Sequence, residues 1–106
     1  MAKVDTITLK GASKKTYGFD VYPWGTSFNA VGVVYAVLKA NQSNYSILYI
    51  GETGDLSSRF DDHHKQSCFD RNEKTHIGIY LESSEKRRLA IEADLLANYN
   101  TPCNDQ

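Results

Sequence analysis

The sequence predicts an α+β domain in which helices flank a small antiparallel β-sheet that carries an extra N-terminal β-hairpin. Two observations lead to this class. Five segments of strand length are apolar or alternate between apolar and polar residues, and two longer segments have capped helical patterns. Their order, β-β-β-β-α-β-α, is typical of helices packed on a mainly antiparallel sheet. With 106 residues, 41% of them hydrophobic, the chain suits one domain, residues 1–106, with a single core.

The first two strands form the predicted hairpin. Residues 6–9 and 17–22 alternate in polarity, and the polar turn at 11–15 separates them. Together with the turn that follows, this hairpin makes up an extension, residues 1–28, in front of a core at residues 31–106. The extension is expected to widen the sheet, form the edge of a dimer or guide a substrate with its lysines.

The core contributes three further strands. Residues 32–39 form a continuous apolar run rich in β-branched residues, which indicates a central strand. Residues 46–51 are its expected hairpin partner across the polar loop 41–44. Residues 75–82 alternate in polarity and are predicted as the last strand.

Two helices complete the prediction. The first is expected over about residues 56–66 behind an N-cap at Asp55, with a loop at 67–74 after it. The second begins after Ser84, has Glu85 favourably placed in its first turn and runs to about Tyr99. Pro102 closes it.

Composition limits the functions that the chain can have. The net charge is −1, which argues against a strongly basic nucleic-acid binder. The charge is uneven, because residues 1–40 carry five basic and two acidic side chains while residues 41–106 carry seven basic and eleven acidic ones. No stretch approaches the ~20 apolar residues needed to span a bilayer, and the first residues lack the pattern of a signal peptide. We therefore expect a cytoplasmic protein with Cys68 and Cys103 as free thiols.

Glu92 breaks the pattern of the second helix. It shares a helical stripe with Leu89, Ala93 and Leu96, where a lone carboxylate would be costly to bury. Two explanations are open: pairing with Arg88 one turn earlier, or coordination of a divalent ion such as Mg²⁺.

Arg59 and His63 form a second unusual group. They are four residues apart, which places them on one face of the predicted helix. An arginine fork suits a phosphate, and the imidazoles of His63 and His64 can exchange protons near neutral pH. The alternative is an ordinary amphipathic surface helix.

Tyr35 and Tyr49 lie in two strands that are predicted to be in the core. Phenylalanine or valine would pack there without a hydroxyl group to satisfy. If both tyrosines lie on the same face of the sheet, their phenols converge near Arg59. A nearby cation would lower a phenol pKa from its usual value of about 10 and make proton transfer possible.

Together these residues resemble the GIY-YIG endonuclease family over about residues 31–106. Val33-Val34-Tyr35 resembles the first half of the motif that names the family, and Tyr49-Ile50-Gly51 matches the second half. Four further positions match, in order, the family's helix arginine, a His or Tyr position, the metal-binding glutamate and the C-terminal asparagine: Arg59, His63, Glu92 and Asn104.

The resemblance implies a small three-stranded antiparallel sheet flanked by helices and metal-dependent hydrolysis of phosphodiester bonds in nucleic acid, DNA rather than RNA. It implies one Mg²⁺ or Mn²⁺ ion on Glu92, a tyrosine that helps to deprotonate water, and charge stabilisation by Arg59. His63 would shuttle a proton or contact phosphate. The supporting residues would be Gly51, His64 and Asn104.

The chain departs from the family pattern in two further respects. The motif tyrosines are separated by thirteen residues, a longer spacing than is common, and Glu52 stands near a position where some members carry a lysine. One alternative is therefore a catalytically weak or inactive module on the same fold that binds nucleic acid or protein. Another is a zinc site built from His63, His64 and Cys68, although a fourth ligand is missing nearby. The sequence leaves substrate structure open, and a homodimer or a separate targeting protein could supply specificity.

Overall fold

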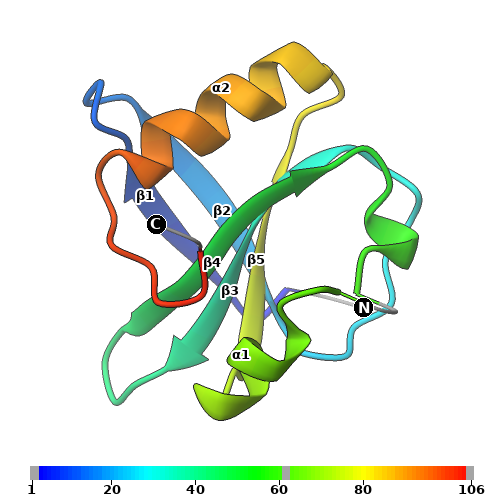
Figure 1. The fold of residues 1–106 in the computed structure, drawn as a ribbon, viewed down its shortest axis with the longest axis vertical. Helices are drawn as coiled ribbons and strands as arrows, with labels where there is room; N and C mark the ends of the chain where they lie inside the picture. Colours follow the sequence, from blue (N-terminus) through cyan, green and yellow to red (C-terminus); the bar gives the residue numbers. More distant parts are fainter. Residues whose placement is uncertain (1–2, 61–62, 105–106) are drawn as a thin grey trace.

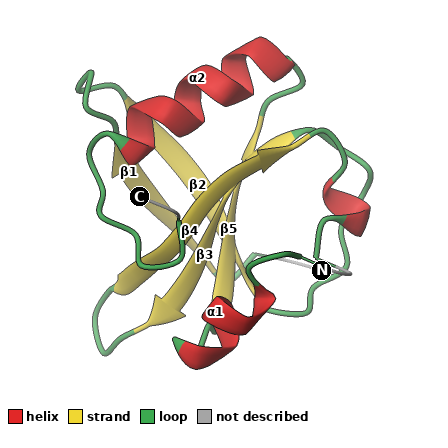
Figure 2. Ribbon diagram, viewed as in Figure 1, coloured by secondary structure: helices red, strands yellow, loops and turns green. Residues whose placement is uncertain are grey.

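The structure, a computed structural model, describes residues 3–60 and 63–104. Its strands form one antiparallel sheet in the order β1-β2-β5-β3-β4 (Figures 1 and 2). In chain order, the strands are β1 (Asp5–Lys10), β2 (Thr16–Pro23), β3 (Val33–Ala40), β4 (Tyr45–Thr53) and β5 (His76–Leu81). The predicted α+β class and antiparallel sheet are therefore confirmed.

The N-terminal hairpin widens the core sheet. Strand β2 pairs with β5 from Asp20 opposite Ile79 to Pro23 opposite His76, and β1 forms the outer edge. The sheet also curls, so that its two edge strands come together. The Tyr45 hydroxyl on β4 donates a hydrogen bond to the Asp5 carboxylate on β1, at 3.0 Å. The extension and the core thus belong to one continuous sheet.

The two faces of the sheet bury different side chains because successive residues of a strand point to opposite sides. One face packs against helix α2 (Glu85–Leu96), whose Ile91 and Leu95 join the apolar cluster of Val34, Ala36 and Ile50. Helix α2 lies along this side of the sheet in Figure 1. The other face carries a second cluster, which includes Val33, Tyr35, Val37, Tyr49, Leu56, Phe69, Ile77 and Ile79.

A β-bulge in β4 explains the long spacing between the two motif tyrosines. Val37 pairs with Tyr49 and Leu38 with Ile47, so Leu48 is an extra residue. As a result Leu48 and Tyr49 both join the second cluster, although they are neighbours in sequence. Tyr35 pairs with Gly51 and Val37 with Tyr49 on the same side of the bulge, so alternation along β4 puts Tyr49 on the same face as Tyr35.

The predicted helix over residues 56–66 is wrong, and so is the loop over 67–74. A short 3₁₀ helix, η1 (Leu56–Ser58), is followed later by α1 (Gln66–Arg71). The Asp55 cap is confirmed, since its carboxylate accepts a hydrogen bond from the Ser57 amide at 2.9 Å. Serine, aspartate and histidine are weak helix formers that bond to nearby backbone. The His63 ring does so by accepting a bond from the Lys65 amide.

The buried face of α2 also differs from the prediction. Leu89 and Ala93 are exposed, whereas Arg88, Ile91 and Leu95 face the sheet. The cap at Ser84 is confirmed, because its hydroxyl accepts a hydrogen bond from the Arg87 amide. Packing of the branched and long apolar chains Ile91 and Leu95 against the sheet therefore sets the rotation of the helix, and Glu92 lies at the edge of the buried face.

The prediction of free thiols is wrong as well. Cys68 in α1 forms a disulfide with Cys103 near the C-terminus. The Cys103 amide donates a hydrogen bond to the Leu48 carbonyl at 2.8 Å, so the disulfide joins α1 to the segment that lies against the bulge of β4. Reduced thiols thus no longer support the cytoplasmic assignment.

Among the described residues, none of the helices combines the length and the apolar character that crossing a membrane requires.

Candidate active site

The Tyr35 hydroxyl is the meeting point of the predicted residues. It accepts a hydrogen bond from Arg59 Nε at 2.9 Å and lies 2.8 Å from His63 Nε2. The side chain is fully buried in the centre of the sheet. Burial raises the pKa of this phenol, although the hydrogen bond from Arg59 opposes the shift. Tyr35 therefore remains protonated at neutral pH and serves as a fixed anchor for the two side chains that contact it.

His63 is a neutral imidazole with both ring nitrogens engaged. Nδ1 accepts a hydrogen bond from the Lys65 amide at 3.0 Å, so its proton is on Nε2, which donates to the Tyr35 hydroxyl. Burial, assisted by the charges of Arg59, His64 and Lys65, lowers the pKa of His63 to about 4. His64 is exposed and stacks on the His63 ring at 4.8 Å between centroids.

The Arg59 side chain is anchored on Tyr35 through its guanidinium group. Its Nε bonds to Tyr35, and its guanidinium carbon lies 5.8 Å from the centroid of the Tyr35 ring. The guanidinium also interacts with the Tyr49 phenol. Its planar fork of donor groups matches the oxygens of a phosphate.

Tyr49 lies beside Tyr35, with ring centroids 6.0 Å apart. Burial raises the pKa of its phenol, the charge of Arg59 lowers it and the charge of Glu92 raises it further. The Tyr49 side chain is only 8% exposed, and its hydroxyl interacts with the Tyr35 phenol and the Arg59 guanidinium.

Gly51 leaves the space that the two tyrosine rings occupy. A Cβ atom at this position would lie 2.6 Å from the Tyr35 hydroxyl oxygen and 2.8 Å from Tyr49 Cε2. Both distances are shorter than real Cβ contacts, so any side chain would displace one of the rings. This steric requirement gives a physical reason for glycine after Tyr49-Ile50.

Asn104 supports β4 from outside the sheet. Its side chain accepts a hydrogen bond from the Ile50 amide and donates one to the Ile50 carbonyl, each at 2.9 Å. These bonds occupy backbone groups that an edge strand would otherwise leave open. Asn104 thus holds the residue between Tyr49 and Gly51, and its side chain also accepts a hydrogen bond from the Thr101 hydroxyl.

Glu92 stands across β4 from the tyrosine cluster. Arg88, one turn earlier, does not pair with it, because Arg88 Nε binds Glu52 Oε1 at 2.8 Å and its Nη1 donates to the carbonyls of Glu82 and Ser83. Glu92 is half-buried and has no hydrogen bond or ion pair with the described residues. Burial raises the pKa of its carboxyl group, the charge of Glu52 raises it further and that of Arg59 lowers it.

These donors fit Mg²⁺ or Mn²⁺ better than zinc. Glu92 is a carboxylate without a cationic partner, and Mg²⁺ is commonly held by one or two carboxylates with water and substrate oxygens as the other ligands. Glu52 is committed to Arg88, so Glu92 is the residue that would hold the ion. No cluster of three or more His, Cys, Asp or Glu occurs in the described ranges. The zinc alternative loses its thiolate, because Cys68 is in a disulfide.

The structure therefore brings together Tyr35, Tyr49, Arg59 and His63 by direct contact, with Gly51 beneath them and Glu92 within electrostatic reach. Sequence reasoning missed two contributors. One is the pairing of Glu52 with Arg88, which leaves Glu92 unpaired. The other is Phe60, whose ring contacts both Tyr35 and His63. No signal in the sequence identifies either pairing.

Comparison of this chain with models of protein families, with curated proteins and with solved structures found no match.

Replacing Gly51 by alanine tests the packing beneath the tyrosines. We expect Gly51→Ala to lower the free energy of unfolding by about 1–3 kcal/mol, because the new methyl group collides with the Tyr35 and Tyr49 rings. Gly18→Ala, also in a strand, is the matched control, since nothing lies within 4 Å of the added atom. Urea unfolding measures both. Equal stability of the two variants would show that the rings do not depend on Gly51.

The lowered pKa of His63 predicts a specific acid sensitivity. The folded chain keeps His63 neutral down to about pH 4, while the unfolded chain protonates it near pH 6.5. Its contribution is therefore fully present above pH 6.5 and is lost as the pH falls toward 4. The loss amounts to about 2–3 kcal/mol over that range.

Stability measured between pH 7 and 4 should fall less steeply for His63→Gln than for the unaltered chain. His64→Gln, an exposed neighbour, should keep the original slope. The comparison isolates His63, because Glu92, whose pKa is raised, contributes the opposite slope in every variant. The same slope in the His63→Gln variant would contradict a buried neutral imidazole.

Proposed function

We propose that this chain is an endonuclease of the GIY-YIG type that hydrolyses phosphodiester bonds of nucleic acid, with DNA preferred over RNA and one Mg²⁺ or Mn²⁺ ion as cofactor. One observation carries the proposal: the Arg59 guanidinium, anchored through its Nε on Tyr35, and the Glu92 carboxylate both act electrostatically on the phenol of Tyr49. Positive and negative groups in this arrangement suit a phosphate and a cation bound side by side.

In this proposal Arg59 binds the phosphate. Its Nε is held by Tyr35, which orients the guanidinium, and its terminal nitrogens are the groups that would donate hydrogen bonds to phosphate oxygens. The fork is positioned before the substrate arrives, and it therefore stabilises the added negative charge of the pentacoordinate transition state without reorganisation.

Glu92 supplies the negative charge that holds the metal ion. When bound, a divalent ion supplies positive charge that lowers the pKa of nearby water and stabilises the leaving oxygen. Glu92 itself is suited to this role because burial and the neighbouring Glu52 make its isolated negative charge unfavourable, which a cation relieves.

The geometry distinguishes between the two tyrosines. The Tyr35 hydroxyl is engaged by Arg59 and His63 and is fully buried, so it orients the site and does not meet the substrate. Tyr49 is 8% exposed and lies within electrostatic reach of both Arg59 and Glu92. We assign to Tyr49 the hydrogen bond to the attacking water. Positive charge bound at Glu92 would lower the phenol pKa, so that the phenol loses its own proton to solvent and the phenolate oxygen then accepts the proton of the attacking water.

The remaining site residues mainly position Tyr35 and Tyr49. His63 fixes Tyr35 and has no nitrogen left for phosphate, so we assign it a positioning role. Gly51 and Asn104 keep β4 in place under Tyr49. His64 is exposed beside His63 and is the imidazole that a substrate can reach.

The resemblance of six positions to the GIY-YIG pattern supports the proposal independently of the geometry. A nucleic-acid- or protein-binding module without activity on the same fold remains a second candidate, favoured by the net charge of −1 and by the raised pKa values of both phenols. Binding that weakens steeply with salt but gives no cleavage products would identify a module that binds nucleic acid.

Replacing Glu92 by glutamine tests the proposal directly. We expect Glu92→Gln to reduce Mg²⁺-dependent cleavage by at least about 100-fold, because the amide cannot hold the ion, while the fold is retained. The assay is a panel of single-stranded, duplex, flapped and branched DNA and of RNA, each with Mg²⁺ or Mn²⁺. Glu85→Gln on the exposed face of the same helix is the matched control and should cleave as the unaltered chain does.

Two results would refute the proposal. One is full activity in Glu92→Gln, which would exclude this carboxylate as the metal ligand. The other is the absence of cleavage by the unaltered chain on every substrate and with both ions. In that case, salt-dependent binding would support the inactive module.

A further inference from the structure

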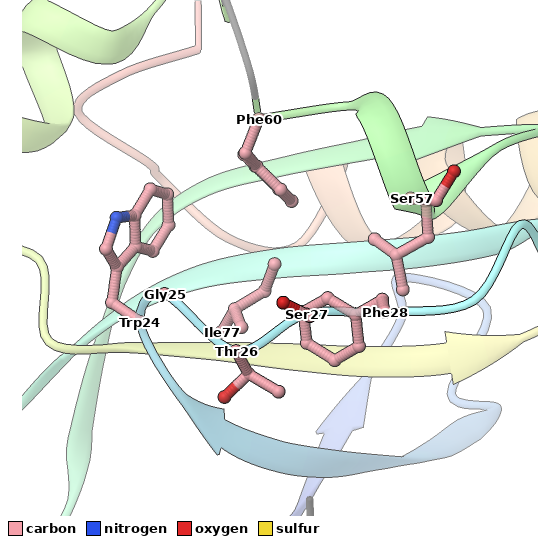
Figure 3. A pocket seen from close by; sticks show the side chains of 9 residues that line it. Trp24, Gly25, Thr26, Ser27, Phe28, Ser57, Phe60 and Ile77 are labelled. Atoms are coloured by element: carbon pink, nitrogen blue, oxygen red, sulfur yellow. The ribbon is translucent and has the colours of Figure 1, made fainter.

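A hollow of about 270 Å³ lies next to the tyrosine cluster, on the same face of the sheet. The connection between β2 and β3 forms one side of it, the segment around η1 forms another, and Ile77 of β5 forms the floor (Figure 3). Its volume is near the lower end of ligand pockets, which span roughly 300–1,000 Å³, and this size suits one ring system better than a long chain.

Aromatic rings form the walls of this hollow. Trp24 and Phe28 face it from the connecting segment and Phe60 from the segment after η1, with the three side chains on different sides of the space in Figure 3. Trp24 and Phe60 are 5.2 Å apart between centroids in an edge-to-face arrangement. The exposed ring surfaces offer stacking positions for a flat, polarisable group.

Phe60 connects the hollow to the proposed active site. Its ring contacts Tyr35 edge-on, 5.0 Å between centroids, and it follows Arg59 directly in the chain. The Arg59 guanidinium carbon, 5.8 Å from the Tyr35 ring centroid, and the Phe60 ring thus lie against the same tyrosine. A nucleotide suits such neighbouring positions, because its base is attached to the phosphate through a single sugar.

We propose that the hollow receives an unpaired nucleobase of the strand whose phosphate is bound by Arg59. The proposal rests on the proposed nuclease function and names its substrate class: a strand with at least one unpaired nucleotide beside the cut, as in single-stranded, flapped or damaged DNA. A base held in a stacked pair could not enter a pocket lined by Trp24, Phe28 and Phe60.

The charge of the chain supports this source of affinity. Nucleic-acid binding that relies on phosphate contacts alone needs many basic residues, whereas this chain has a net charge of −1. Stacking of a base on aromatic side chains contributes about 1–3 kcal/mol per base without any net charge. The ammonium group of Lys74 lies 5.4 Å from the Trp24 ring centroid, but it forms a salt bridge with Asp70, so stacking on the rings is the main source of affinity at this side.

The rim of the hollow also suits a base. The side chains of Thr26, Ser27 and Ser57 carry hydroxyl groups around the aromatic walls. The hydroxyls of Thr26 and Ser57 donate their protons to the Pro23 carbonyl and the Asp55 carboxylate, so toward a base edge they can act as acceptors. The N-terminal extension thus contributes substrate contacts through Trp24 to Phe28, a role separate from its part in the sheet.

Trp24 is the single tryptophan of the chain and reports directly on the hollow. The experiment titrates the unaltered protein in EDTA, where no cleavage occurs, and follows Trp24 fluorescence. The ligands are a thymidine hexanucleotide, the same backbone with abasic sites in place of bases, and free dTMP. We expect saturable quenching by the hexanucleotide and roughly tenfold weaker binding of the abasic strand.

Phe28→Ala removes one wall while leaving the reporter in place. It should weaken binding of the hexanucleotide roughly tenfold. Leu81→Ala, an exposed apolar side chain outside the hollow, should leave binding unchanged. A circular-dichroism melt establishes that both variants are folded.

Three outcomes would overturn the inference: equal binding of abasic and complete strands, no effect of Phe28→Ala in the folded protein, or free dTMP binding as tightly as the strand. The outcome is independent of activity. Base-dependent quenching without cleavage supports base binding in the hollow and contradicts the nuclease proposal. Cleavage without base-dependent quenching supports the nuclease proposal and contradicts base binding in the hollow.

Discussion

The two hydrogen bonds at the Tyr35 hydroxyl are the interaction on which the rest of the site depends. Arg59 and His63 come from a segment that is not a regular helix, so no backbone ladder fixes their relative positions. One buried oxygen in the central strand does so instead. Since Tyr35 is fully buried between two neighbouring strands, its position is set by the sheet, and the sheet thereby sets the position of the arginine fork.

The structure around Tyr35 maintains this arrangement from several directions. Gly51 leaves room for the ring, and alternation along β4 puts Tyr49 on the same face. The C-terminal segment then covers the free edge of β4, where Asn104 pairs with the Ile50 backbone and Cys103 is joined to α1 through Cys68. The backbone groups of an edge strand can otherwise pair with another strand, and the C-terminal segment prevents such pairing beside the site.

The ion pair between Arg88 and Glu52 leaves Glu92 as the carboxylate that is available to bind a cation. Arg88 is buried and binds Glu52 together with two backbone carbonyls, so it has no role left for Glu92. Glu92 consequently carries an unneutralised charge next to Tyr49 and Arg59, and its raised pKa expresses that cost. The open carboxylate on which the proposed cation site relies follows from this pairing, because the same helix with Arg88 turned to Glu92 would have no open ligand.

Residue patterns predicted the strands and the cap of α2 well, because alternation and capping are local. The convergence of Arg59 and His63 was predicted from a helical spacing of four, but it arises through Tyr35 from a segment without that helix. Arg88 pairs with a glutamate 36 residues away, Glu52, and the disulfide joins cysteines 35 residues apart. A pattern of neighbouring residues predicts neither contact. The aromatic hollow brings together three separate segments and was not predicted for the same reason.

The measurement that most directly tests the central role of Tyr35 is the cleavage rate of Tyr35→Phe at saturating substrate and metal. This change removes one oxygen and keeps the ring, so the account predicts a fall of roughly 10- to 100-fold in kcat, because Arg59 loses its anchor. Tyr80→Phe, in the neighbouring strand outside the cluster, should retain its rate. Unchanged kcat in a folded Tyr35→Phe protein would contradict the account, since Arg59 would then be positioned by something other than the Tyr35 hydroxyl.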